Sequence, residues 1–292
     1  MKRILPIALA ALLASAAPAF GASGARYLES HLTASGGIAE QGQPPTVGVT
    51  EWAVMGLRAA GINPGALRRA GGRTPTHYLA SHAAGWSNAF QIEKGILAAV
   101  ALGADPHAFG GRSLVQALRN RVHPSSGRIG NFANSTYWGA LAFAAAREHQ
   151  PARTVHWIES RQQSNGGFSY LSTTPAGADS NDTAAAVMAL RAAGVPCRNH
   201  HLGRAYAYMK TAQGPGHGYS LLPGGSADSQ STSWVIQARA ACSLKNSGAR
   251  AWLAARQASN GSYFYSPGNH QTPVFVTAQV LPAANGRHYP IR

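Results

Sequence analysis

The distribution of apolar residues predicts a chain of helical hairpins. Segments such as residues 183–190 are apolar on nearly every face, and a helix of this kind must be buried on all sides. They alternate with segments that mix apolar and polar positions at helical spacing, for example residues 27–32 and 155–161. Several apolar segments stop at a glycine followed closely by a proline, as at Gly61 and Pro64, which is typical of a helix end. The pattern therefore predicts pairs of helices, one amphipathic and one buried.

The same unit recurs six times, and a threonine near the start of each apolar segment marks its register. Ile92 takes this place in the second unit, and the other landmarks are Thr50, Thr136, Thr183, Thr232 and Thr277. The steps between landmarks are 42, 44, 47, 49 and 45 residues. A Gly-rich turn with an aromatic or apolar residue, such as Phe168 or Tyr263, joins the two helices of a unit.

We predict an all-α (α/α)6 toroid, in which six hairpins place apolar helices in an inner ring and amphipathic helices in an outer ring. An open solenoid of the same hairpins is the alternative. Closure is favoured because residues 276–281 of the last unit remain apolar and form no polar cap. The toroid domain is predicted to span residues 20–285, with residues 286–292 as a C-terminal tail.

The N-terminus is typical of a secretory signal peptide. Lys2 and Arg3 precede an apolar stretch over residues 4–14, and small residues end at Ala19. We predict that residues 1–19 are removed and that the protein is secreted or retained in the periplasm or cell envelope. No apolar run after residue 20 is long enough to span a membrane.

The chain is strongly basic, with 25 Lys and Arg against 10 Asp and Glu and a formal charge of +15. Such a charge suits nucleic acid or an anionic surface. The basic residues are scattered, however, and form no nucleic-acid-binding motif; the densest cluster is residues 67–73. We therefore expect no nucleic-acid partner, and an anionic envelope polymer remains a candidate.

The two cysteines, Cys197 and Cys242, lie 14 and 10 residues after their landmarks, near the same ends of neighbouring buried helices. A disulfide between them is predicted, with two free buried thiols as the alternative. The histidines and cysteines show no zinc-site spacing, so neither a metal nor another cofactor is expected.

Residues 179–190 resemble the Asp-x-Asp-Asp-Thr-Ala motif of squalene cyclases and other class II terpene cyclases. The recurring turns, such as residues 161–168, are similar to the prenyltransferase/squalene oxidase repeat, and the resemblance covers residues 26–285. It implies the toroid fold. It implies less about activity, because the same toroid serves cyclases, protein prenyltransferases, cobalamin carriers and thioester proteins.

In the family motif the middle aspartate donates the proton that starts cyclisation, and Asn181 occupies that place here, between Asp179 and Asp182. A carboxamide has no acidic proton near working pH, so Asn181 cannot act as a general acid. Asn134 and Gln230 stand at the equivalent place in two other units, which indicates a structural role for this loop. Catalysis by Asp179 or Asp182 is the alternative.

Three tryptophans share one register position, two residues after the landmark: Trp52, Trp138 and Trp234. If this position faces the toroid axis, three indoles surround one level of it, where they suit an apolar or cationic ligand. The alternative places them in the core between the two rings.

These patterns lead to one functional hypothesis and one alternative. The chain is predicted to be a non-catalytic binding protein for an apolar small molecule or a partner. Its candidate ligand-binding residues are Trp52, Trp138, Trp234, Asn134, Asn181 and Gln230. The alternative is an isoprenoid cyclase that uses Asp179 or Asp182 as its acid.

Overall fold

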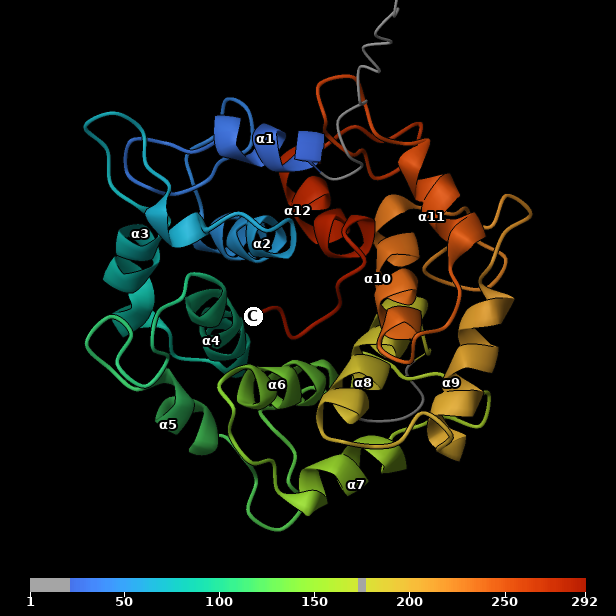
Figure 1. Cartoon of the computed structure of the whole chain (residues 1–292). Coiled ribbons are helices and arrows are strands. Elements are labelled where there is room, and N and C mark those ends of the chain that lie inside the picture. The colour runs from blue at the N-terminus through green and yellow to red at the C-terminus, as the bar shows by residue number, and fades with distance from the viewer. Residues whose placement is uncertain (1–21, 173–176) are drawn as a thin grey trace, which may run out of the picture.

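The computed structural model describes residues 22–172 and 177–292, so the predicted signal peptide lies outside the described residues. In this part of the chain twelve α-helices form two concentric rings and no β-strand occurs, which confirms the predicted toroid (Figure 1). The inner ring consists of α2 (Val47–Ala59), α4 (Ala89–Ala101), α6 (Ala133–Ala145), α8 (Ser180–Ala192), α10 (Ser229–Ala240) and α12 (Pro273–Ala284). The outer ring consists of α1 (Ala22–Ser30), α3 (Pro75–His82), α5 (Leu114–Arg119), α7 (Ala152–Ser160), α9 (His200–Thr211) and α11 (Ser247–Ala254).

The ring is closed by contact between the first and the last inner helix. Each inner helix packs on the next, and α12 packs on α2. Gly56 makes this approach possible, because a Cβ at this position would lie 2.6 Å from the carbonyl oxygen of Ala278. The carboxylate of Glu40 also accepts hydrogen bonds from the backbone amides of Val274 (3.0 Å) and Phe275 (2.8 Å) at the start of α12. The alternative of an open solenoid is therefore wrong.

The landmark threonine joins the two parts of each unit. In five units its Oγ1 accepts a hydrogen bond from the backbone amide of the apolar residue in the preceding Gly-rich turn, as from Phe168 to Thr183 (2.9 Å). The second unit, which has Ile92 instead, replaces this bond by packing. There the Trp86 indole lies against Gly95, where a Cβ would be 2.2 Å from the ring. The recurring threonine is thus explained by a recurring buried hydrogen bond.

Contacts between neighbouring inner helices show that these helices run in the same direction. At their amino ends, Asn134 of α6 donates to Asp182 of α8. At their carboxyl ends, Arg58 of α2 donates to the carbonyl oxygen of Ala101 in α4 (2.7 Å). Helix carboxyl ends leave carbonyl groups unpaired and carry a partial negative charge, so arginine is well suited to them.

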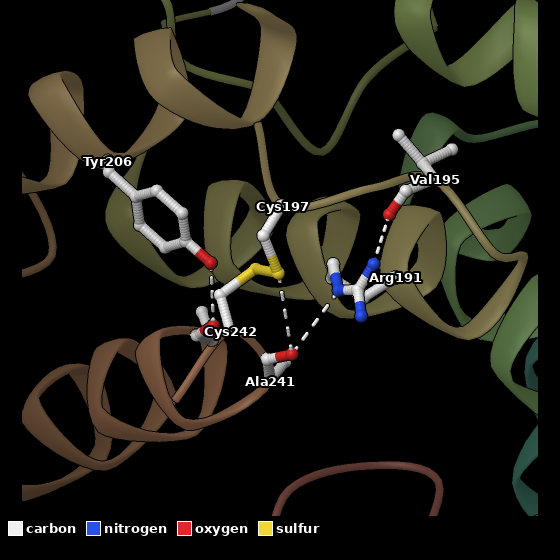
Figure 2. The surroundings of a disulfide bond; sticks show 7 residues. Arg191, Val195, Cys197, Tyr206, Ala241 and Cys242 are labelled. Carbon is white, nitrogen blue, oxygen red and sulfur yellow. Dashed lines mark hydrogen bonds between the residues drawn. A yellow bond between two sulfur atoms is a disulfide. The ribbon is translucent and has the colours of Figure 1, made fainter. Parts of the chain in front are cut away.

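The predicted disulfide is present and joins the carboxyl ends of α8 and α10 (Figure 2). The Cα atoms of Cys197 and Cys242 lie 5.7 Å apart. Arg191 lies beside the bridge and donates to the carbonyl oxygens of Ala241 (3.2 Å) and Val195. The bridge therefore links two neighbouring hairpins at the end of the ring where the inner helices finish.

Residues 286–292, predicted as a tail, turn back into the middle of the ring (Figure 1). Tyr289 and Ile291 are buried, and Arg292 donates to the carbonyl oxygen of Ala144 at the end of α6. The segment therefore occupies the toroid axis on the side of the helix carboxyl ends. Among the described residues, no helix is long and apolar enough to cross a membrane.

Candidate ligand chamber

The three register-matched tryptophans meet at the toroid axis and close it. The ring centroids of Trp52, Trp138 and Trp234 lie 5.4 to 5.7 Å apart, and the planes cross at steep angles. Each side chain is 5% to 8% exposed. On the side of the tail, Tyr289 packs against all three, with centroid distances of 6.0, 5.3 and 5.7 Å. The indoles therefore separate the tail from the other end of the axis.

On the side of the helix amino ends the indoles border a cavity of about 210 Å³, which we call the chamber. Its wall comes from the first turns of five inner helices, so the repeat itself builds the site. The residues that border the chamber are Trp52, Phe90, Glu93, Lys94, Asn134, Trp138, Asn181, Asp182, Ala185 and Trp234.

The aspartates of the cyclase-like motif have different surroundings. Asp179 precedes α8 and caps it, because its Oδ1 accepts a hydrogen bond from the amide of Asp182 (2.8 Å). Asp228 caps α10 in the same way. Asp182 borders the chamber and accepts a hydrogen bond from the side-chain amide of Asn134. Burial raises the pKa of Asp182 well above its ordinary value, and the neighbouring Asp179 raises it further.

The chamber also contains an acid that the sequence reasoning missed. Glu93 is fully buried, and neither oxygen of its carboxyl group has a hydrogen-bond partner among the described residues. Burial raises the pKa of Glu93 well above its usual range, and nearby Glu51 adds to the rise while Lys94 opposes it. Glu51, on the neighbouring α2, has its pKa raised by burial to about 8. Glu51 is therefore mainly protonated near neutral pH, and burial favours the neutral form of Glu93.

The structure brings most of the candidate ligand-binding residues together, with one exception. Gln230 donates to Gln279 (2.8 Å) and does not border the chamber. The sequence does contain a pattern that marks the missed acids. Glu51 and Glu93 occupy the same position of consecutive units, one residue after the landmark. An acid repeated within an otherwise apolar helix indicates a site.

The fold and the chamber define the class of protein: an (α/α)6 toroid with an aromatic and acidic axial site. No family model matches the chain, and no curated protein matches it. Among solved structures, it is similar to a variant of the type II terpene cyclase MstE from Scytonema in complex with geranylgeranyl dihydroxybenzoate. The TM-score is 0.65 at 15% identity, over 91% of this chain and 95% of that one.

Two further structures match equally broadly. A protein from Actinoplanes gives a TM-score of 0.64 at 18% identity, over 91% of this chain and 98% of that one. A glycosidase gives a TM-score of 0.62 at 11% identity, over 91% and 95%. These likenesses show a terpene cyclase-like toroid fold. They do not select a reaction, because a cyclase and a glycosidase share this architecture.

The volume of the chamber limits what it can hold. Sites for drug-sized ligands are usually about 300–1,000 Å³, whereas a cavity of about 150 Å³ holds benzene. At about 210 Å³, the chamber suits a molecule with one ring and a short substituent. The geranylgeranyl substrate of MstE is far larger than this volume.

Proposed function

We propose that this protein binds a small, mainly apolar molecule in the chamber, against the indoles of Trp52, Trp138 and Trp234. The observation that carries the proposal is an axial cavity whose floor is formed by three aromatic side chains from alternate units. Aromatic floors of this kind supply a large apolar contact area, while the few polar groups around them set the orientation of a ligand.

A chamber-filling variant tests this proposal. Ala185 borders the chamber, and Ala192, two turns further along α8, borders the cavity beside the tail. Ethylbenzene, which fits the volume, should raise the Tm of the wild type and of Ala192→Leu, but not that of Ala185→Leu. An absent shift in the wild type, or an equal shift in Ala185→Leu, would contradict binding in the chamber.

A second candidate is acid-catalysed conversion of a short isoprenoid. The observation that favours it is that two carboxyl groups, Glu93 and Asp182, border the chamber, and burial raises the pKa of each well above its ordinary value. Either carboxyl is a candidate to replace the acid that Asn181 lacks, because general acid catalysis needs a protonated donor close to the reacting atoms.

Product analysis by gas chromatography separates the two candidates. An acid-catalysed reaction should convert geraniol but not geranylgeraniol, because the longer chain exceeds the chamber. Product formation should be lost in Glu93→Gln or Asp182→Asn and retained in Asp228→Asn, a buried carboxyl that does not border the chamber. If neither alcohol is converted, the catalytic candidate fails and the binding proposal stands.

We also propose that the protein acts outside the cytoplasm. The bond between Cys197 and Cys242 supports this location, because disulfides persist mainly in oxidising compartments. An anionic envelope polymer remains a proposed partner for the basic surface.

A further inference from the structure

The chamber gathers acidic side chains, although the whole protein is strongly basic. The chain has 25 Lys and Arg against 10 Asp and Glu. Two of those ten acids, Glu93 and Asp182, border the chamber. Two more, Glu51 and Asp179, are close enough to act electrostatically on them. Of the described residues on the wall, Lys94 alone is basic. A strongly basic protein thus gathers a large share of its few acids at one small cavity.

The wall also has hydrogen-bond acceptors without donors. Both carboxyl oxygens of Glu93 and the amide oxygen of Asn181 are buried, and none has a hydrogen-bond partner among the described residues. A buried polar atom without a partner is costly, so such atoms usually receive a bond from something that the site holds. A ligand that donates N–H or O–H bonds would give these oxygens the partners that the described residues do not supply.

The indole floor of the chamber also favours a ligand that carries a positive charge. Indole rings attract a cation through their quadrupole, and an ammonium group is also a donor of several hydrogen bonds. Metal cations such as Ca²⁺ take six to eight oxygen ligands, which indole walls do not supply. The chamber therefore favours an organic cation over a metal ion. It combines acids, unpartnered acceptors and indoles around a volume that suits a molecule with one ring.

We propose that the chamber selects a small aromatic or alicyclic amine in its protonated form, whose apolar body lies on the indole floor and whose ammonium group bonds to Glu93. This inference rests on the proposed function and names the ligand class of the same site. Asp182 and Asn181 border the same cavity and are the further acceptors within it. Lys94 is half-buried on the same wall, and its charge opposes the binding of a cation.

Three probes with the same number of heavy atoms test the ligand class. Benzylammonium, benzyl alcohol and ethylbenzene differ in one group, which is a charged donor, a neutral donor or a methyl. We expect benzylammonium to bind at least about tenfold more tightly than either neutral probe, measured by calorimetry on the full chain. Glu93→Gln should abolish this preference, and Asp228→Asn should retain it.

Proton release gives a second measurement that needs no variant. The charged groups that surround Glu93 are Glu51 on α2, Lys94 on its own helix and Asp182 across the chamber on α8. Burial raises the pKa of Glu93 well above its ordinary value, so an ammonium group that binds its carboxylate should release a proton from it into the buffer. Calorimetry in two buffers of different ionisation enthalpy should show this release for benzylammonium and none for benzyl alcohol.

The possible results separate the inference from the proposed function. If ethylbenzene or benzyl alcohol binds as tightly as benzylammonium, the preference for a cation is wrong and binding in the chamber stands. If the preference survives Glu93→Gln, or if no proton is released, the assignment to Glu93 is wrong. If none of the three probes binds, the proposed function fails together with the inference.

Discussion

The two ends of the toroid axis differ in three respects: the ionisable side chains around them, how far the axis is filled, and the hydrogen bonds that these side chains make. At the end where the inner helices begin, acids surround an open chamber of about 210 Å³. At the other end, the tail fills the axis and leaves a cavity of about 430 Å³ whose wall includes Arg58, Arg287 and Arg292. Arginines at that end bond to helix carbonyl groups, whereas two of the acids at the chamber end cap helices or bond to a neighbouring amide.

This difference indicates a division of roles. Arg58 and Arg292 bond to carbonyl groups at the helix carboxyl ends, so they contribute to the closed ring. At the chamber end, Glu93 and Asn181 keep buried oxygens without partners, and such groups destabilise the fold unless a ligand satisfies them. Buried polar groups without partners are expected at functional sites, where a group that binds a ligand lowers the stability of the ligand-free protein.

The largest expected loss of stability is at the boundary between the two ends, where Tyr289 packs on the indoles. Replacing its buried ring in Tyr289→Ala should lower the free energy of unfolding by about 3–5 kcal/mol, because a cavity remains beneath three aromatic side chains. Urea unfolding followed by tryptophan fluorescence measures this loss.

Tyr289→Phe is the matched control. The hydroxyl oxygen of Tyr289 is buried and has no hydrogen-bond partner among the described residues. Removing it should leave the stability unchanged or slightly higher. Equal losses in both variants would show that the hydroxyl, rather than the ring, anchors the tail.

The next effect concerns the disulfide at the carboxyl end. Replacing both cysteines, in Cys197→Ser with Cys242→Ser, should lower the free energy of unfolding by up to about 4 kcal/mol, the chain-entropy value for a loop of 45 residues. Adding reductant to the wild type should produce the same loss in urea unfolding. A loss in the variant without any effect of reductant would point to local packing instead.

The architecture follows from the sequence because both rings are determined by local patterns. The spacing of Thr50, Thr136 and the other landmarks fixed the register, and the structure shows the buried hydrogen bond behind it. The cysteine pairing followed from the same register. These features depend on periodicity, which a single sequence displays.

The chamber was only partly predictable, because it depends on where units meet. The register brought Trp52, Trp138 and Trp234 to one level, but it did not show that they touch and close the axis. Glu51 and Glu93 repeat one position of consecutive units, but the sequence does not show which of the two side chains borders a cavity. The position of residues 286–292 depends on a return of the chain that no repeat pattern encodes.

The stability of the chamber end should depend on pH in the direction set by its buried acids. Glu51 has its pKa raised from 4.5 to about 8, so the folded state holds this proton over a range in which the unfolded state loses it. The stability that Glu51 contributes is therefore fully present below about pH 4.5 and is lost as the pH rises to about 8.

Glu51→Gln removes this dependence without changing the shape of the side chain. Relative to wild type, the variant should gain up to about 1.4 kcal/mol per pH unit between those two values and nothing further above them. Urea unfolding of both proteins at several pH values gives the difference. A difference that stays constant with pH would mean that Glu51 titrates normally in the folded state.

The smallest expected effect concerns Lys94, which alone among the described residues of the chamber wall is basic. Lys94 opposes a bound ammonium group, so Lys94→Gln should increase the affinity for benzylammonium by roughly two- to fivefold, the range expected for a partly exposed charge. Ethylbenzene should bind the variant and the wild type equally, because a neutral probe does not feel the charge. Calorimetry at low and high salt checks the cause, since salt should shrink the gain for benzylammonium. An unchanged or weaker affinity for benzylammonium in Lys94→Gln would contradict a repulsion between Lys94 and the bound ammonium group.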